Sequence, residues 1–400
     1  MRIGMMADVY KPYVSGITNH IALTKRFLEA AGHEVFIFTF GEEDHYEDDE
    51  PNVIRSPGLP LVDTGYYLNI RYNLPAQKLL RTMQIVHVHH PFLSGRLALR
   101  YCEPRNIPVV FTNHTRYDLY AHAYLPALPE GLSETFLRTY LPSFCASCDM
   151  VIAPSSGMQD VLRRFGVTTS VEVVPNGVDL APMRSPVVAV DRVDLGFSAE
   201  DVLLVFTGRL GPEKNLPFLL RAFAGTAKAY DHVGLMILGS GPERENLEDR
   251  VQHMGITGRV RFTGMIPYEK LPGYLAAADA FVTASVTEVH PLSVIEAMAT
   301  GLPVLGVQSP GVGDIVEDGV SGLLSEEDVA VFTAKMVRMV TDCEMRKAMA
   351  IQARLQSENY AVERTTSILL DHYQRLVDHA AGRKQGLRTR LAQLIDGWNK

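Results

Sequence analysis

Short apolar segments alternate with amphipathic helical segments along almost the whole chain, and this alternation constrains the fold more than any other feature. The apolar segments are rich in β-branched and aromatic residues and are bounded by Gly, Pro or polar residues, which is typical of buried strands. They are residues 2–6, 33–40, 84–89, 108–112, 149–154, 171–175, 201–208, 233–239, 259–264, 279–284, 302–306 and 322–325. Amphipathic stretches such as 17–32 lie between them. Near-continuous apolar strands separated by helices predict parallel, doubly wound sheets.

The number of strand-like segments favours two sheets over one. A single sheet of about a dozen strands is less common than two sheets of about six, and 400 residues suffice for two or three domains. The break should fall in the non-periodic stretch 179–199, which contains two prolines. We therefore expect an α/β fold with two Rossmann-like domains, 1–180 and 199–355, joined by a linker at 181–198. These doubly wound parallel-sheet domains should face each other across a cleft, with ligands at the carboxyl ends of the strands.

The composition is that of a globular protein without a strongly basic character. Hydrophobic residues make up 46% of the chain and charged residues 21%, which is enough apolar material for full-sized cores. The formal net charge of −8 argues against a nucleic-acid partner. The sequence has no run of roughly 20 apolar residues and no secretory signal at its N-terminus. We therefore expect a cytoplasmic protein.

Two groups of potential metal ligands occur, and neither has a complete ligand set. Cys145 and Cys148 form a C-x-x-C spacing. These cysteines could pack between a helix and a strand, or they could bind zinc or take part in redox chemistry. The chain has no second such pair, which favours packing. His87, His89 and His90 alternate along a strand end without matching carboxylates. We therefore predict no bound metal.

Four groups of residues follow predicted strands, where a doubly wound sheet binds ligands. Gly16 lies between the first strand and the first helix, and it either forms an ordinary turn or lets the backbone approach a ligand. Arg209 and Lys214 follow the strand at 201–208. These two cations suit a phosphate or diphosphate, although a solvated turn could also carry them.

The remaining groups carry carboxylates and a histidine. Glu288 and Glu296 could accept hydrogen bonds from the hydroxyls of a sugar or a ribose. The alternative is that one of them caps the helix and the other is a surface residue. The amides beside Leu292 and Ser293, at the start of a predicted helix, are suited to a phosphate. His114 follows a buried strand and taken alone fits a structural role.

Together and in this order, the segments resemble one enzyme family. The matching motifs are D-x-Y-x-P-x-x-S-G-I at 8–17, His114 after its strand, VPNGVD at 174–179, GRLGPEKN at 208–215, GSGPE at 239–243, and two glutamates separated by seven residues at 288–296, followed by AMATGLPV. This combination is similar to the retaining glycosyltransferases of family four over nearly the whole chain. The resemblance implies the GT-B architecture, with an acceptor-side N-terminal domain and a nucleotide-sugar-side C-terminal domain. It also implies that a helix at 356–380 crosses back to the N-terminal domain.

The resemblance implies catalytic roles for four residues. Arg209 and Lys214 would neutralise the departing diphosphate. Glu288 would bind the transferred hexose near its 3- and 4-hydroxyls, and His114 would contact the hexose beside the reacting centre. The implied reaction is α-retaining transfer along a front-face, oxocarbenium-like path, in which the leaving phosphate helps to deprotonate the acceptor. The sequence has no Asp-x-Asp triplet, so we expect cations rather than a metal to serve the diphosphate.

The same resemblance implies a nucleotide-sugar site. Glu296 would bind the ribose hydroxyls, and Gly16 would let its loop approach the phosphate. The remaining nucleotide-binding positions would be Gly239, Gly241, Leu292 and Ser293. The chain departs from the family after Glu288, where His290 and Pro291 replace a Gly-rich segment and Pro291 lacks a backbone N–H. The donor sugar is therefore open.

Two internal segments and the C-terminus bear on the acceptor. Residues 55–75 and 113–124 look similar to bacterial glycosyltransferases that glucosylate diacylglycerol or make sulfolipid, although the first also fits a loop packed on its own domain. The tail at 381–400 combines an apolar helical face with a basic cluster, which suits either an anionic membrane surface or docking on its own protein. The apolar residues of the tail are Leu387, Leu391, Leu394, Ile395 and Trp398, and the basic ones are Arg383, Lys384, Arg388 and Arg390.

We therefore predict an enzyme that moves glucose from UDP-glucose to a lipid such as diacylglycerol, peripherally on the inner face of the cell membrane and without a required cofactor. One alternative is transfer to a soluble sugar or polysaccharide, or from GDP-mannose or UDP-sulfoquinovose. A second is a non-catalytic nucleotide-sugar-binding module. The presence of all the motif residues together argues against that second alternative.

Overall fold

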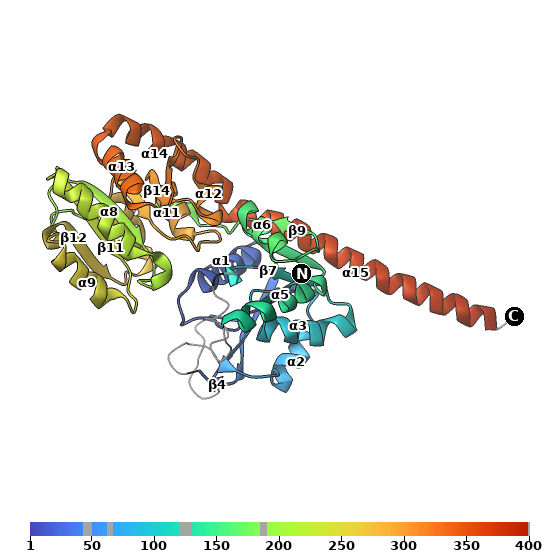
Figure 1. Ribbon diagram of the computed structural model, residues 1–400. Helices are drawn as coiled ribbons and strands as arrows, with labels where there is room; N and C mark the ends of the chain where they lie inside the picture. The colour runs from blue at the N-terminus through green and yellow to red at the C-terminus, as the bar shows by residue number, and fades with distance from the viewer. Residues whose placement is uncertain (43–49, 62–66, 118, 120–129, 185–189, 399–400) are drawn as a thin grey trace. The chain divides into compact units, whose positions relative to one another are not determined.

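The computed structural model describes residues 1–42, 50–61, 67–117, 119, 130–184 and 190–398. The chain divides into two compact units, each with its own parallel sheet (Figure 1). Unit 1 comprises Met1–Pro154, Met158–Gly177 and Glu363–Lys400, and unit 2 comprises Ser155–Gly157 and Val178–Val362. The predicted α/β class, with two Rossmann-like parallel-sheet domains, is confirmed.

The sheet of unit 1 has seven parallel strands in the order β3-β2-β1-β6-β7-β8-β9. Its strands are β1 (Arg2–Met6), β2 (Glu34–Gly41), β3 (Val53–Pro57), β6 (Ile85–Val88), β7 (Val109–Thr112), β8 (Met150–Ala153) and β9 (Val171–Val173), and a separate antiparallel pair is formed by β4 (Leu59–Pro60) and β5 (Tyr67–Leu68). Met5 of β1 pairs with Ile37 of β2 and with His87 of β6. β1 therefore lies inside the sheet, and the segments after β1, β6 and β7 emerge along one edge.

The helices of unit 1 cover both faces of this sheet. They are α1 (Gly16–Ala30), α2 (Leu74–Leu80), α3 (Leu93–Cys102), η1 (Glu103–Arg105), α5 (Glu130–Ala146), most of α6 (Ser156–Arg164) and α15 (Val362–Trp398). On one face, Ile21 of α1 and Tyr373 of α15 share a buried core with Ile3 of β1. On the other, Phe144 of α5 packs edge-on against Phe111 of β7. Coverage of both faces explains why the inner strands β1, β7 and β8 are largely apolar.

The sheet of unit 2 has six parallel strands in the order β12-β11-β10-β13-β14-β15. Its strands are β10 (Val202–Thr207), β11 (Val233–Leu238), β12 (Val260–Gly264), β13 (Ala280–Thr283), β14 (Val304–Val307) and β15 (Gly322–Ser325). Side chains of a strand point alternately to the two faces. Accordingly, Leu204 and Phe206 of β10 lie in one buried core, and Leu203 and Val205 lie in the other.

The helices of unit 2 are α7 (Leu180–Arg184), η2 (Pro212–Lys214), α8 (Leu216–Ala229), α9 (Arg244–His253), η3 (Thr257–Arg259), η4 (Tyr268–Lys270), α10 (Leu271–Ala276), α11 (Leu292–Thr300), α12 (Pro310–Ile315), α13 (Val329–Thr341), α14 (Cys343–Ser357) and η5 (Glu358–Tyr360). Phe223 of α8 and Phe332 of α13 cover one face of the sheet, and Leu275 of α10 and Ile295 of α11 cover the other. Each loop after a strand therefore begins at the same edge, where the predicted ligand residues are found.

Two other features of the described chain bear on the expectations from sequence. Cys145 and Cys148 are both buried free thiols, and Cys148 Sγ donates a hydrogen bond to the carbonyl of Phe144. Burial raises the pKa of the Cys145 thiol to about 12, which suits packing rather than metal or redox chemistry. Among the described helices, we find none long and apolar enough to cross a membrane.

Candidate functional site

In unit 2, the structure brings together a predicted cation and a predicted carboxylate. Lys214 ends η2, after β10, and Glu288 follows β13, the next strand in the sheet. The Lys214 Nζ lies 2.6 Å from Glu288 Oε1, and the two side chains are 22% and 17% exposed. The hydroxyls of Ser285 and Thr287 both donate to the carbonyl of Glu213 and so hold the two loops together. The pair is therefore a preorganised, half-buried charge site at the carboxyl edge of the sheet.

Arg209 lies on the same loop as Lys214 but in a different environment. Its side chain is exposed, and it forms no ion pair with any residue that the structure describes. Its charge is thus available to an anion from solution, whereas the charge of Lys214 is already balanced by Glu288.

The glycines of the GSGPE motif join two loops. Leu210 N–H donates to the carbonyl of Ser240, and a Cβ atom on Gly239 would lie 1.9 Å from the carbonyl oxygen of Gly208. A Cβ on Gly241 would lie 2.4 Å from the carbonyl oxygen of Leu210. Side chains at Gly239 and Gly241 would therefore separate the loops that carry the candidate site, whatever further role these glycines have.

The start of α11 offers backbone donors. Pro291 is its N-cap and supplies no side-chain hydrogen bond, and Leu292 and Ser293 form the half-buried first turn. First-turn amides have no intrahelical acceptor and carry the positive end of the helix dipole. This geometry is compatible with the predicted phosphate contact. The departure from the family at His290 is accommodated by burial, because its ring packs edge-on against Tyr360.

Glu296, one turn further along α11, is the most strongly perturbed carboxylate of unit 2. Its side chain is 7% exposed, and Tyr268 donates a hydrogen bond of 2.9 Å to its Oε1. Burial raises the pKa of Glu296 to about 7, and the hydrogen bond from Tyr268 only partly opposes this effect. A buried carboxyl that changes charge near neutral pH is a common property of functional sites.

In unit 1, Gly16 is the first residue of α1. Ser15 caps the helix, because its hydroxyl accepts from the N–H of Thr18 and its own N–H donates to the Thr18 hydroxyl. A Cβ on Gly16 would meet nothing within 4 Å. Packing among the described residues therefore does not require glycine at this position.

His114 belongs to a cluster of histidines that the sequence did not reveal. His89 follows β6, His114 follows β7, and His20 lies in the second turn of α1. His89 Nδ1 lies 3.0 Å from His114 Nε2, and the ring of His20 lies 5.1 Å from that of His114 between centroids. Burial lowers the pKa of His20 to about 4 and places those of His89 and His114 well below the ordinary range. All three rings are therefore neutral at pH 7.

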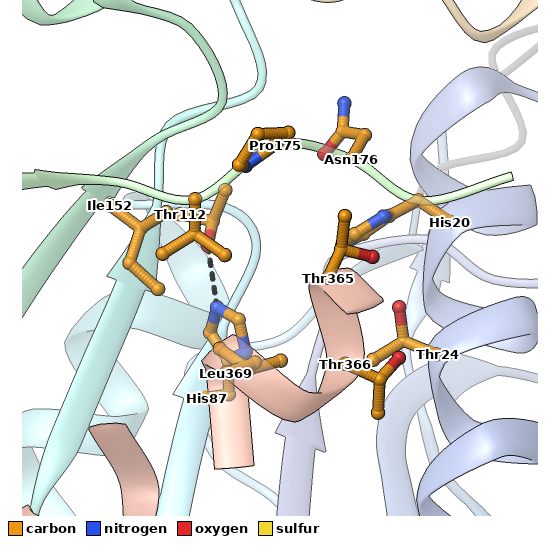
Figure 2. Close-up of a pocket in the computed structure, with 11 residues that line it drawn as sticks. His20, Thr24, His87, Thr112, Ile152, Pro175, Asn176, Thr365, Thr366 and Leu369 are labelled. Carbon is orange, nitrogen blue, oxygen red and sulfur yellow. Dashed lines mark hydrogen bonds between the residues drawn. The ribbon is translucent and has the colours of Figure 1, made fainter. Parts of the chain in front are cut away.

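His87 connects this cluster to α15. Its Nε2 lies 2.7 Å from Thr112 Oγ1 and its Nδ1 lies 2.5 Å from the Tyr373 hydroxyl. His87 lies beside a cavity of about 20 Å³, which has room for one water molecule. Figure 2 shows the residues that line it, from α1, the strand ends and the start of α15. His20 and Thr366 line its other side. The alternation of histidines along β6 was visible in the sequence, but no sequence signal paired His87 with Tyr373.

Parts of the predicted acceptor segments lie outside the described residues. These are 62–66 in the first segment and 118 and 120–124 in the second. The backbone of α15 is helical to Trp398, but the side chains of 383–400, including the basic cluster and the apolar face, are also outside the described set.

Comparison with known proteins gives this arrangement a family. A model described as Glycosyltransferase Family 4 matches residues 14–182, and one described as Glycosyl transferases group 1 matches residues 188–356. The chain is 32% identical over 341 residues to the alpha-monoglucosyldiacylglycerol synthase of Streptococcus pneumoniae. The aligned residues make up 82% of this chain and 77% of the relative. The chain is a family 4 glycosyltransferase. The predicted family is thus confirmed.

Two further comparisons extend over most of this glycosyltransferase. The alpha-monoglucosyldiacylglycerol synthase of Acholeplasma laidlawii is 26% identical over 377 residues, 91% of this chain and 94% of the relative. The crystal structure of Anabaena HepE in complex with UDP and glucose superposes with a TM-score of 0.75 at 18% identity, over 94% of this chain and all of HepE. This likeness confirms the predicted GT-B fold.

Proposed function

We propose that this glycosyltransferase moves glucose from UDP-glucose, with retention of the α-configuration, to a lipid acceptor such as diacylglycerol at the cytoplasmic face of the membrane. The observation that carries the proposal is the similarity to two alpha-monoglucosyldiacylglycerol synthases over 82% and 91% of the chain. The arrangement of charges in unit 2 supports it, because a diphosphate leaving group needs fixed cations rather than covalent chemistry.

The proposed donor site uses the residues at the carboxyl edge of unit 2. Arg209 and Lys214 would stabilise the departing diphosphate, and Glu288 would accept hydrogen bonds from the 3- and 4-hydroxyls of the hexose. Glu296 would bind the ribose hydroxyls. The amides at the start of α11, beside Leu292 and Ser293, together with Gly239 and Gly241, would complete the nucleotide contacts.

Lys214 would change partners when the donor binds. Without a ligand its Nζ is 2.6 Å from Glu288 Oε1, so the pair is electrically balanced. A diphosphate would compete for Lys214, and the hydroxyls of the hexose would replace the ammonium as hydrogen-bond donors to Glu288. Because charge on the diphosphate increases as the glycosidic bond breaks, Lys214 would stabilise the transition state more than the bound donor.

In the proposed reaction, the bond between the glucose C1 and the β-phosphate oxygen breaks, and a bond from C1 to the acceptor oxygen forms on the same face. The acceptor hydroxyl proton passes to the departing phosphate, which becomes UDP. His114 of unit 1 would contact the hexose beside C1, and Gly16 would let the α1 turn approach the phosphate. No residue of the protein needs to form a covalent bond, and we propose that no metal is required.

The surface of unit 1 supports a lipid-facing role for the described residues from β4 to α2. Leu59, Ile70 and Leu74 are 75%, 81% and 69% exposed, although large aliphatic side chains usually avoid water. The exposed cations Arg71 and Lys78 lie on the same stretch. A mixed apolar and basic surface suits the headgroup layer of an anionic membrane.

The proposal is tested by a transfer assay with radiolabelled UDP-glucose and a chelator. Vesicles containing diacylglycerol are compared with matched vesicles without it and with a panel of soluble sugars. We expect label to enter the lipid phase only with diacylglycerol, and NMR of the product to show an α-linkage. Label that stays in the aqueous phase would exclude the lipid acceptor and favour a soluble sugar or polysaccharide.

The donor is tested in the same assay. Transfer only from GDP-mannose or UDP-sulfoquinovose would contradict glucose as the transferred sugar. Binding of UDP-glucose without transfer to any acceptor would instead favour a non-catalytic nucleotide-sugar-binding module.

A further inference from the structure

Three imidazole rings converge at the carboxyl edge of the unit 1 sheet. They belong to His20 of α1, His89 after β6 and His114 after β7. One ring nitrogen of each lies within 4.8 Å of one ring nitrogen of each of the others. These segments are far apart in the sequence but neighbours in the fold, because β6 lies between β1 and β7.

The spacing of the three rings is that of a metal-binding triad. In a tetrahedral site with metal–nitrogen bonds of about 2.0–2.1 Å, two coordinating imidazoles have nitrogens about 3.3 Å apart and ring centroids about 5.2 Å apart. The nearest nitrogens of His89 and His114 are 3.0 Å apart. The ring centroids are separated by 5.1 Å for His20–His114, 5.2 Å for His89–His114 and 5.9 Å for His20–His89. Coordination would require His20 and His89 to approach each other, because their rings are the most widely separated of the three pairs.

Two nitrogens of the triad lack the partners that buried polar atoms normally have. His20 Nδ1 and His89 Nε2 are buried, and neither has a hydrogen-bond partner among the described residues. His20 is 8% exposed and His89 is fully buried. An unpartnered buried nitrogen is costly, and a bound ion or water is a common explanation for an atom such as His20 Nδ1. His89 approaches His114 through Nδ1, so in a coordinated site His89 Nε2 would carry the hydrogen of that ring. His87, in contrast, uses both of its nitrogens in bonds to Thr112 and Tyr373 and stays outside the triad.

We propose that His20, His89 and His114 bind one divalent cation of borderline softness, with Zn²⁺ as the physiological example. Imidazole nitrogens favour Zn²⁺, Co²⁺, Ni²⁺ and Cu²⁺ over Mg²⁺ and Ca²⁺, which prefer oxygen. Neutral rings are the form that coordinates a metal, so binding needs no proton release but only a shift of the hydrogen to the other ring nitrogen. Each histidine supplies one of the four ligands of a tetrahedral site, which leaves the fourth position for water.

The cation would regulate this enzyme rather than assist its chemistry. His114 is the residue that the proposed function places against the transferred hexose, and a metal on its ring would remove it from that contact. The metal site itself stands on the geometry of unit 1 and is independent of the proposed sugar and acceptor. Its consequence for transfer, inhibition that a chelator reverses, rests on the proposed function.

The test is a titration of the full-length, chelator-treated protein with Co²⁺, followed by competition with Zn²⁺, in the absence of any sugar nucleotide. We expect one equivalent of Co²⁺ to produce the intense visible absorption of a tetrahedral site and one equivalent of Zn²⁺ to abolish it. H20Q should lose this signal, and H253Q, which changes an exposed histidine on α9, should retain it. Thermal unfolding with and without Zn²⁺ gives a second readout, with an increase in Tm for the wild type and H253Q only.

Metal binding by the wild type and by the histidine variants decides whether the three histidines form the site. A wild-type protein that binds no Co²⁺ or Zn²⁺, or whose binding is unchanged by both H20Q and H114Q, overturns the proposal. Far-UV circular dichroism of each variant shows whether loss of binding reflects loss of folding; if H20Q is unfolded, H114Q, at a half-buried position, takes its place. Metal binding without any effect on transfer retains the site but contradicts the role of His114 in the proposed reaction.

Discussion

Replacing Glu296 with glutamine should stabilise the protein at pH 8 and leave its stability unchanged near pH 4.5. Burial raises the pKa of this carboxyl to about 7 from an ordinary value of 4.5. Between these pH values the folded state holds more protons than the unfolded state, so the free energy of unfolding falls as the pH rises. At about 1.4 kcal/mol for each pH unit in this window, the wild type loses about 3 kcal/mol by pH 7–8. Glutamine cannot ionise, but its oxygen still accepts from Tyr268.

The assay is urea unfolding followed by far-UV circular dichroism at pH 4.5, 6 and 8. The matched control is E248Q, which changes an exposed glutamate on α9 and should follow the wild type at every pH. We expect the E296Q curve to separate from the wild type as the pH rises, with a difference of about 3 kcal/mol at pH 8. Parallel curves for wild type and E296Q would refute the reasoning, because they would show that this carboxyl is ionised at little cost.

The same substitution tests the ribose contact. In the proposed site, ribose hydroxyls would donate to the charged carboxylate, so binding of UDP should favour ionised Glu296. Between pH 5.5 and 7 this coupling strengthens UDP binding by up to about fifteenfold in the wild type, because the ionised fraction of a carboxyl with a pKa of about 7 rises by that factor. Calorimetric titration of wild type and E296Q at both pH values separates this effect from the titration of UDP itself. An equal pH dependence in the two proteins would leave Glu296 as a buried carboxyl without a ribose role.

Three further predictions concern transfer and membrane binding. K214A should lower kcat by about a hundredfold or more, while its circular dichroism spectrum stays that of the wild type. K228A, which changes an exposed lysine on α8, should retain the wild-type kcat. A K214A variant with the wild-type kcat would exclude the leaving-group role. E288Q should weaken binding of UDP-glucose more than that of UDP in calorimetry, and an equal loss for both ligands would contradict its contact with the hexose. I70S/L74S should reduce co-sedimentation with anionic vesicles severalfold without changing the Tm, and wild-type binding should fall with added salt. Unchanged sedimentation would exclude Ile70 and Leu74 from the membrane contact.

Much of the fold was predictable because the two sheets are covered on both faces. A strand buried on both sides must be apolar throughout, as 202–207 and 233–238 are, and such runs are visible without knowledge of their neighbours. The order of the strands and the long α15 carry no comparable local signal. The packing of Tyr373 against His87 joins residues 286 positions apart, and nothing in either segment indicates this contact.

The candidate site was predictable where a charged residue directly follows a predicted strand. Lys214, Glu288 and Glu296 each follow a strand of unit 2 in a motif of defined spacing, so their common edge could be inferred. Their charge states could not, because these depend on partners and burial. Tyr268, which donates to Glu296, lies on η4 between other elements and belongs to none of the recognised motifs. His20 was missed because a polar residue in an amphipathic helix usually faces solvent, whereas this one is buried.

The charge balance of unit 2 leads to a last prediction, in which Arg209 and Lys214 have different effects on kinetics. Lys214 is already paired with Glu288. In the proposed reaction, the charge of Lys214 therefore becomes available only when the diphosphate of the donor displaces Glu288 from it. Arg209 is exposed and forms no ion pair within the described part of the chain, so it should attract the diphosphate before the bond breaks. R209A should therefore raise KM for UDP-glucose and weaken its dependence on salt, while K214A should mainly lower kcat. The same change in both parameters for the two variants would show that the cations act as one unit, and the pairing of Lys214 with Glu288 would then have no kinetic consequence.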